Sequence, residues 1–458
     1  MLRRWQSECV ESALEKYNAG QKHFLCLATP GAGKTKMAAE VAARLREQKS
    51  IDIILCFSPS LSVAAGIQQT FSRRLDCSFN GSMGAIGSSY TYQSMLYLKD
   101  DFWKSINKYR VLVVFDEIHH CAGSSLKDAN AWGEEIITKI QDKAKYTLAL
   151  TGTPWRSDST PIVLSQYSGQ SGKILCDFTY GLREAVQDRV CRSPNIVLVD
   201  NDKLTIKKED KCTKVYSSIP EFLKESTMSY QSIITHRDAM KHVLRIGCQK
   251  LNNIRRENPR AGGLVVASSV EHANKIAMLL RDEFYQTTTV VTYRHDNPLD
   301  EIALFRRGKT QWIVSVGMIS EGTDIPRLQV CCHLSTVKTE LYFRQVLGRI
   351  LRFNDVPNQE AWLYTIAEPK LTEFAERIAV DIPEDNVIKE ACSSSTVEAS
   401  PECNNKERLS TSLRNLAIST KDTNQLEWGY ENTGSSSNLM LSDLDLLGHF
   451  RERLLRAF

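Results

Sequence analysis

The sequence predicts an α/β protein made of two tandem domains, each with a mostly parallel sheet, and three observations support this class. Short apolar runs alternate with helical patterns from residue 23 onward. A second run of the same kind begins near residue 261, after a polar and charge-rich stretch. Such alternation is typical of β-α-β units. The length of 458 residues also exceeds what one hydrophobic core organises.

The first domain is expected over residues 1–190. Its predicted strands are continuous apolar runs, the pattern of strands that are buried on both faces. The expected elements are strand 23–28, helix 34–46, strand 51–57, helix 64–75, and strands 111–115 and 147–150. We expect residues 191–260 to form a helical connector to the second domain, because they are polar and helical in pattern.

The second domain is expected over residues 261–375. Its expected elements are strand 263–267, helix 271–281, strands 288–292, 312–316 and 330–334, and helix 340–351. Residues 376–438 are rich in serine and asparagine and poor in apolar runs, which predicts a partly flexible linker. Apolar residues recur near helical spacing over 439–458, so we expect a terminal amphipathic helix there.

Composition and charge narrow the function only slightly. The 58 basic and 54 acidic side chains give a net charge of +4, too small to indicate a polyanionic partner by itself. The 13 cysteines contain no C-x-x-C pair, which favours reduced thiols over a zinc or redox site. No run approaches the length of a membrane span, and the N-terminus lacks the apolar stretch of a signal peptide. We expect a cytoplasmic protein with no membrane partner.

Residues 28–35, here called the phosphate loop, carry the strongest local signal. They read Ala-Thr-Pro-Gly-Ala-Gly-Lys-Thr between an apolar strand and an alanine-rich helix, the context of a phosphate-binding loop. Glycines let backbone N–H groups approach phosphates, Lys34 can reach the β- and γ-phosphates, and Thr35 can ligate Mg²⁺. The predicted contacts are Thr29, Gly31, Ala32, Gly33, Lys34 and Thr35. Ala28 replaces the first glycine of the strict pattern, so a glycine-rich turn without nucleotide is the alternative.

Asp116 and Glu117 directly follow the predicted strand 111–115, where a carboxylate would lie beside the phosphate loop. Asp116 is the predicted Mg²⁺ ligand, and Glu117 would polarise the attacking water. His119 and His120 could instead be metal ligands. Adjacent imidazoles are expected to point apart, however, and no third ligand is evident. Two motifs in this order predict a nucleoside triphosphatase.

Gln345, Arg349 and Arg352 follow an i, i+4, i+7 spacing in a predicted helix and would share one face. Two guanidinium groups there could cross a cleft and stabilise charge on a transferring phosphoryl group. A solvated basic edge of a helix is the alternative interpretation of this pattern.

In this order the blocks resemble superfamily 2 helicases of the DExH type. Thr151-Gly152-Thr153-Pro154 resembles motif III, whose residues Thr151 and Thr153 would couple hydrolysis to domain closure. Residues 320–326 resemble motif V, which implies nucleotide contacts at Gly322 and Asp324, and residues 345–352 resemble motif VI. The resemblance implies two RecA-like domains with a cleft between them, and ATP with Mg²⁺ as the cofactors.

Weaker blocks complete the resemblance over roughly residues 1–370. Arg4-Trp5-Gln6 resembles the Q motif, so Gln6 would contact adenine, although a surface glutamine is the alternative. Short hydroxyls at strand ends suit phosphate contact, but they also cap helices. The residues that resemble motifs Ia, Ib and IV, and that would bind nucleic acid, are Ser58, Pro59, Ser60, Thr91, Gln93, Ser268 and Ser269.

Residues 150–156 and 320–326 look most like helicase subunits of restriction enzymes and related phage- or plasmid-borne helicases. This likeness favours DNA over RNA. We therefore expect an ATP-dependent nucleic-acid helicase or translocase. The alternative is a nucleic-acid-binding ATPase switch in a larger complex, with a nuclease or methyltransferase as a separate partner subunit.

Overall fold

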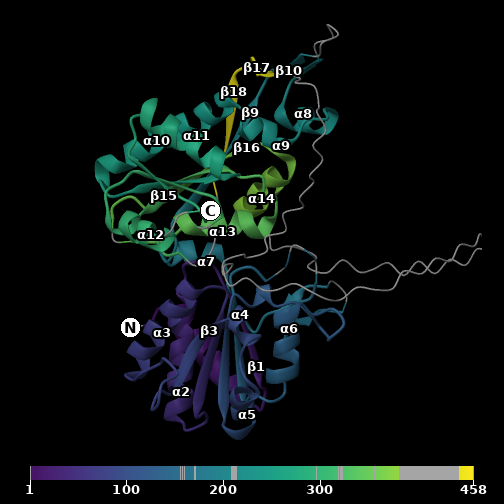
Figure 1. The fold of residues 1–458 in the computed structure, drawn as a ribbon, viewed down its shortest axis with the longest axis vertical. Helices are drawn as coiled ribbons and strands as arrows, with labels where there is room; N and C mark the ends of the chain where they lie inside the picture. Colours follow the sequence, from purple (N-terminus) through teal and green to yellow (C-terminus); the bar gives the residue numbers. More distant parts are fainter. Residues whose placement is uncertain are drawn as a thin grey trace, which may run out of the picture.

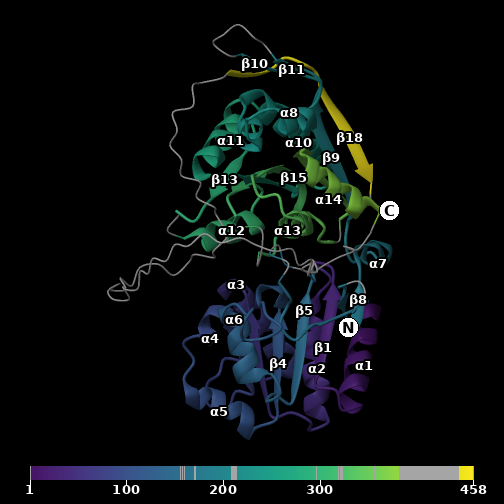
Figure 2. The ribbon, with the colours of Figure 1, turned by 90° about the vertical axis from the view of Figure 1, so that its right-hand side faces the viewer.

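The computed structural model describes residues 2–154, 156, 158, 160–169, 172–207, 214–294, 297–317, 319, 323–354, 356–380 and 443–456. Two mostly parallel sheets with helices on both faces are arranged end to end (Figure 1). The expected α/β class with two tandem domains, each built on a mostly parallel sheet, is confirmed. Helix α7 (Leu182–Gln187) lies where the chain crosses from the first sheet to the second (Figure 2).

The first sheet has six parallel strands in the order β3-β2-β4-β5-β1-β8. Its strands are β1 (His23–Ala28), β2 (Ile53–Ser58), β3 (Gly87–Thr91), β4 (Val111–Asp116), β5 (Tyr146–Thr151) and β8 (Phe178–Tyr180). Side chains alternate between two cores: Leu112 and Val114 face one, and Val113 and Phe115 face the other. This alternation explains why the strands appear as continuous apolar runs.

Helices cover both faces of the first sheet. One face packs against α1 (Arg4–Asn18), α2 (Lys34–Glu47) and α3 (Leu61–Leu75). The other face packs against α4 (Tyr92–Met95), α5 (Asp100–Lys108), α6 (Ala131–Glu135) and the π-helical turn Ile136–Ile140. A 3-10 turn, Ile118–His120, follows β4, and β6 (Gln166–Tyr167) pairs with β7 (Ile174–Leu175).

The second sheet has seven strands in the order β13-β14-β12-β15-β16-β9-β18, of which only the edge strand β18 is antiparallel to its neighbour. Its strands are β9 (Ser193–Asn201), β12 (Gly262–Ala267), β13 (Thr288–Val291), β14 (Trp312–Ser315), β15 (Leu328–Leu334), β16 (Glu360–Ile366) and β18 (Phe450–Arg456). A small sheet joins β10 (Leu204–Lys207) to β11 (Lys214–Tyr216) and β17 (Asp443–Leu446).

Seven helices accompany the second sheet in the described part of the chain. They are α8 (Ile219–Glu225), α9 (Tyr230–Ile234), α10 (Arg237–Glu257), α11 (Val270–Asp282), α12 (Pro298–Arg307), α13 (Glu340–Ile350) and α14 (Pro369–Val380). The longest, α10, packs along β15 and β16. It buries an apolar face that includes Val243, Leu244 and Leu251.

Two expectations about the organisation are wrong. The expected helical connector contains β9, which pairs with β16 inside the second sheet, so this region belongs to the second domain. The described residues of the expected terminal helix form β17 and β18 instead. Strand β18 lies along the open edge of β9, as Figure 2 shows, and its backbone bonds there outweigh the helical spacing of its apolar side chains. The predicted linker lies outside the described residues from 381 onward.

Among the described residues, every cysteine is a free thiol. No helix in this described part of the chain is long and apolar enough to cross a membrane.

Candidate nucleotide site and nucleic-acid interface

The phosphate loop connects β1 to α2. Gly31 and Gly33 have φ angles of 85° and 94°, the left-handed region that glycine enters without strain. Gly33 caps α2, so the first backbone N–H groups of the helix face the loop. Ala28 is the buried last residue of β1, and its carbonyl accepts a hydrogen bond of 3.2 Å from Lys34 Nζ. A strand residue needs no left-handed backbone, which explains why alanine is tolerated where the strict pattern has glycine.

Lys34, Glu117 and Gly152 bring three separate motifs together. Lys34 Nζ lies 3.1 Å from Glu117 Oε1. The backbone N–H of Gly152 donates to Glu117 Oε2 at 3.1 Å. Glu117 has a φ of 54°, a left-handed conformation at the end of β4 that turns its side chain toward these partners. The predicted water-polarising carboxylate is therefore held at the phosphate loop.

Asp116 at the end of β4 and Thr35 at the end of the phosphate loop carry oxygen atoms that could ligate a metal ion. Asp116 ends β4 and is 7% exposed, and the Tyr92 hydroxyl donates to its backbone carbonyl at 2.8 Å. Thr35 is in the first turn of α2. Carboxylate and hydroxyl oxygens are ligands that Mg²⁺ takes in proteins. The chemistry of this donor set therefore fits the predicted ion.

His119 links residues 116–119, here called motif II, to motif III. Its Nδ1 lies 3.0 Å from Thr151 Oγ1 and 3.4 Å from Thr153 Oγ1. The expectation that His119 and His120 point apart is wrong, because their ring centroids are 4.5 Å apart. The described residues nonetheless contain no group of three histidine, cysteine or acidic side chains that could hold a metal. The geometry thus gives His119 a bridging position that the sequence did not indicate.

The side chain of Gln6, in α1, contacts the phosphate loop and is only 2% exposed, so the surface-glutamine alternative is wrong. Its Nε2 donates to the Gly33 carbonyl at 3.0 Å, and its Oε1 accepts from the backbone N–H of Arg3 at 2.8 Å. The Arg3 side chain donates to the Ala32 carbonyl at 2.8 Å. Arg3 was missed in the sequence, although its place beside the Arg4-Trp5-Gln6 block was a usable signal.

The second domain presents motif VI to the same loop. Arg349 Nη1 donates to the Thr323 carbonyl at 2.7 Å, and Arg352 Nη2 donates to the same oxygen at 3.2 Å. Arg352 Nη1 also pairs with the Asp324 carboxylate. Helix α13 ends at Ile350, so the expectation that Arg352 shares its face is wrong. The two guanidinium groups still converge, through their common acceptor rather than through helical spacing.

Direct packing joins motif VI to the phosphate loop. A Cβ atom placed on Gly31 would lie 3.5 Å from Arg352 Cγ. A Cβ atom on Gly348 would lie 2.7 Å from Pro30 Cβ, closer than side chains tolerate. Gln345 is buried in α13, and Asp324 also contacts Arg306 at 3.4 Å. Residues 320–322, which include the predicted contact Gly322, lie outside the described residues.

The predicted nucleic-acid contacts occupy strand ends, as expected, but several are engaged locally. Ser58 and Thr91 are register partners in β2 and β3, and both side chains are buried. Pro59 is buried as well, whereas Gln93 is exposed. Three of the hydroxyls cap helices, in line with the alternative weighed for them: Ser60 caps α3, Thr91 caps α4 and Ser269 caps α11.

Ser268 differs from these caps, because its Oγ lies 2.8 Å from Nδ1 of the buried His272. Burial lowers the pKa of His272 to about 4. Ser60, Ser268 and Ser269 remain partly exposed and Gln93 is exposed, so phosphate contact at these four residues stays a prediction.

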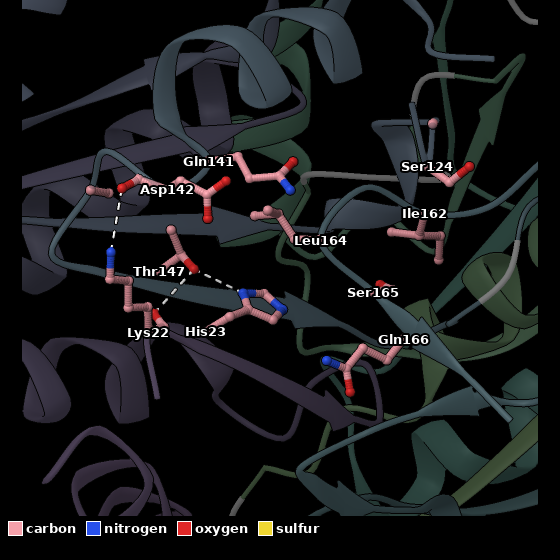
Figure 3. Close-up of a pocket in the computed structure, with 12 residues that line it drawn as sticks. Lys22, His23, Ser124, Gln141, Asp142, Thr147, Ile162, Leu164, Ser165 and Gln166 are labelled. Atoms are coloured by element: carbon pink, nitrogen blue, oxygen red, sulfur yellow. Dashed lines mark hydrogen bonds between the residues drawn. The ribbon is translucent and has the colours of Figure 1, made fainter. Parts of the chain in front are cut away.

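A cavity of about 340 Å³ lies elsewhere in the first domain, at the amino ends of β1 and β5 (Figure 3). His23 Nδ1 lies 2.8 Å from Thr147 Oγ1 beside it, and burial lowers the pKa of His23 to about 4. Its lining contains none of the predicted site residues. The nucleotide motifs instead gather at the opposite, carboxyl ends of these strands.

Comparison with known proteins agrees with this arrangement. Residues 1–156 match the family described as type III restriction enzyme, res subunit, and residues 246–354 match the helicase conserved C-terminal domain. An uncharacterized protein of Mycobacterium tuberculosis is 31% identical over 83% of this chain and 63% of the relative. The chain thus spans less than two thirds of that relative.

Two further similarities come from better described proteins. A DNA 3'-5' translocase, XPB2, of Sulfurisphaera tokodaii is 23% identical over 81% of this chain and 83% of its own. A fragment assigned to the HsdR subunit of a type I restriction enzyme from Vibrio vulnificus superposes with a TM-score of 0.56 at 16% identity. That superposition covers 85% of this chain and 67% of the fragment, and it supports the fold. The chain belongs to the superfamily 2 helicases of the DExH type, related to restriction-enzyme subunits.

Proposed function

We propose that the protein is an ATP-dependent nucleic-acid translocase or helicase that acts on DNA. One observation carries the proposal: Gly348 and Arg352 of the second domain pack directly on the phosphate loop of the first. Arginine cations stabilise the charge on a transferring phosphoryl group only when they are positioned beside it. Hydrolysis would therefore depend on how the two domains are arranged.

The first domain would bind and activate the nucleotide. Backbone N–H groups at Gly31 and Gly33 and the Lys34 ammonium would hold the phosphates, and Gln6 would contact adenine. Glu117 would orient the attacking water and take its proton. Thr35 and Asp116 would hold Mg²⁺, which neutralises phosphate charge when bound. A bound phosphate would compete with Glu117 for the Lys34 ammonium.

The second domain would complete the site with Arg349 and Arg352, and Asp324 would orient Arg352. Motif III would couple hydrolysis to domain closure, because the Gly152 N–H donates to Glu117 and the Thr151 hydroxyl is hydrogen-bonded to His119. Backbone phosphates would be gripped near Ser60 in one domain and Ser268 in the other. Opening and closing would then move the strand, with affinity that falls as salt rises.

The preference for DNA rests on the relatives. The XPB2 relative is a DNA translocase by name, and the structural relative is assigned to a restriction enzyme. A cytoplasmic location is proposed because the described cysteines are free thiols, which is typical of reducing compartments.

A second function is a nucleic-acid-binding ATPase switch inside a larger complex. Two observations favour it: the chain spans 63% of its mycobacterial relative, and its first family model describes a restriction-enzyme subunit. A nuclease or methyltransferase subunit would be the partner in that case.

The deciding experiment measures ATP hydrolysis alone and with single-stranded DNA, duplex DNA or RNA. We expect DNA to raise turnover at least about tenfold, a barrier change of about 1.4 kcal/mol. Lys34→Ala should abolish the stimulated activity. Turnover that no polymer stimulates would contradict the motor and favour the switch. A strand-displacement assay then separates a helicase from a translocase on intact duplex.

A further inference from the structure

The chain crosses from the first domain to the second through Cys191 and Arg192, just after α7 and before β9 (Figure 2). Cys191 forms an isolated antiparallel bridge with Arg352. Its thiol donates to the Pro30 carbonyl of the phosphate loop, with a sulfur-oxygen distance of 3.6 Å. The backbone N–H of Arg192 donates to the Leu351 carbonyl at 2.7 Å. Two adjacent residues thus contact the phosphate loop on one side and motif VI on the other.

The Arg192 side chain is fully buried and donates to acceptors from separate segments. Its Nη1 reaches the carbonyls of Leu328 at 2.5 Å and Ile350 at 3.2 Å. Its Nη2 reaches the Pro326 carbonyl at 3.0 Å and Asn354 Oδ1 at 2.6 Å. Pro326 is the last residue of motif V, and Leu328 is the first residue of β15. Ile350 belongs to motif VI, and Asn354 follows that motif by two residues.

Because Arg192 is a buried cation, its N–H groups need hydrogen-bond acceptors. Among the described residues, no carboxylate forms an ion pair with it. Burial lowers the pKa of its guanidinium to about 10, so the group stays protonated at neutral pH. A buried cation without a counter-ion is costly unless its donors are bonded. The planar five-donor fork of arginine meets that demand only when all these carbonyls stay in place.

We infer that Arg192 is a positioning residue for ATP hydrolysis, which places Arg352 against the phosphate loop; this rests on the proposed function. Arg352 lies beyond the end of α13, so helical hydrogen bonds do not hold it. Its backbone is held instead by the Cys191 bridge and by the bonds of Arg192 to Ile350 and Leu351, and its side chain bonds Thr323 and Asp324. The same crossing segment touches Pro30, so it sets the distance between Arg352 and the loop.

Arg327 provides a matched comparison within the same domain. It is 6% exposed, and burial lowers its pKa to about 10 as well. Its guanidinium donates to the carbonyls of Arg260, Phe305 and Thr310, none of which belongs to motif V or VI. A purely structural role predicts that replacing either arginine has the same consequences.

The test compares Arg192→Lys with Arg327→Lys in the full chain. Lysine keeps the charge but cannot span the separate acceptors. We expect Arg192→Lys to lower kcat at least about tenfold, since small misplacements of a catalytic group have effects of this size. The Kd for a fluorescent ATP analogue should change less than about twofold, because Arg192 does not touch the phosphate loop's own donors. Arg327→Lys should keep kcat within about twofold.

A double-mutant cycle distinguishes positioning from general damage. In an Arg352→Ala background, Arg192→Lys should have little further effect on kcat, because the group that it positions is already gone. Effects that multiply in the double variant would overturn the inference. Equal losses of kcat in Arg192→Lys and Arg327→Lys would overturn it too.

Two additions keep the test decisive. If Arg192→Lys does not fold, Asn354→Ala removes a single acceptor and should lower kcat about threefold without changing Kd; an unchanged kcat contradicts the inference. Hydrogen exchange of the peptide 344–354 needs no turnover, and it should accelerate in Arg192→Lys but not in Arg327→Lys. Wild-type protein without ATPase activity would refute the proposed function, whereas unaltered exchange would refute the positioning role.

Discussion

The two faces that meet at the phosphate loop are built in different ways. On the first-domain face, Asp116, Glu117 and Thr151 each lie at the end of a strand or directly after it, and Lys34 begins α2 after the loop that follows β1. Parallel strands place their carboxyl ends at one edge of a sheet, so these residues meet as soon as the sheet forms. Short sequence blocks are sufficient to encode this face.

The second-domain face depends on contacts that are distant in sequence. Arg352 follows the last turn of α13, which ends at Ile350. The carbonyl of Ile350 accepts a hydrogen bond from Arg192, which lies 158 residues earlier in the sequence. The Arg352 side chain also bonds Thr323 and Asp324, which belong to motif V. This face is complete only when the crossing segment, motif V and motif VI have assembled. The difference teaches that one face is a property of a single sheet and the other of the domain junction.

Removal of Arg352 should have the largest effect and directly tests the importance of the second face. We expect Arg352→Ala to lower DNA-stimulated kcat by about a thousandfold, the range for a cation that stabilises phosphoryl transfer. Nucleotide affinity should change little, because the first face binds the phosphates. Single-turnover ATP hydrolysis measures the first quantity, and titration with a fluorescent ATP analogue measures the second.

Arg306→Ala is the control for this variant. Arg306 also contacts Asp324, at 3.4 Å, but it lies on α12 and is half exposed. An exposed ion pair contributes little, so its loss should change kcat less than about twofold. Equal losses in the two variants would show that Asp324, rather than Arg352, is the important group.

Much of the fold could be predicted, because its strands are continuous apolar runs. Strand β1 was predicted with its observed ends, and β4 within one residue. Strands β3, β8 and β16 were not among the expected strands, and β9 and β18 were assigned to helical regions. The apolar run 196–199 in β9 stands inside a charge-rich region, which obscured it. Strand β18 alternates arginine, glutamate and leucine, and only its pairing with β9 decides between strand and helix.

The residues of the site fall into the same two groups, those that local sequence spacing predicts and those that distant segments position. The residues of the phosphate loop and of motif II lie where the sequence blocks placed them, because local spacing carries that information. His119, Arg3 and Arg192 were missed, since their roles depend on which segment packs against them. The position of Arg352 was expected from helical spacing, but it results from a bridge to Cys191.

Gly348→Ala should have an intermediate effect, because it disturbs the contact between the faces without removing a functional group. The new Cβ would lie 2.7 Å from Pro30 Cβ, so the domains must separate slightly. We expect kcat to fall about tenfold, as for other small misplacements. Gly66→Ala in α3 is the matched control, because its Cβ would meet nothing within 4 Å. If Gly348→Ala retains wild-type turnover, the faces do not need this close approach.

Acidification should have the smallest effect, and it should separate the two domains by stability rather than activity. Burial lowers the pKa of His23 in the first domain to about 4, and does the same to His272 and His333 in the second. The usual pKa is about 6.5, so below that pH the unfolded chain takes up protons that the folded chain refuses. The free energy of unfolding therefore falls as pH drops from about 6.5 toward 4, and it is unaffected by these groups above 6.5.

The size of the loss follows the number of histidines whose pKa burial lowers to about 4, which are His23 in the first domain and His272 and His333 in the second. From pH 7.5 to 5.5 each contributes about 1.4 kcal/mol, so we expect about 1.4 kcal/mol for the first domain and about 3 kcal/mol for the second. Hydrogen exchange of amides in β1 and β15, corrected for the intrinsic pH dependence of exchange, measures both. His333→Gln should halve the loss in β15 and leave that in β1 unchanged. Equal losses in the two strands would mean that the domains unfold as one unit, so that the junction stabilises both faces together.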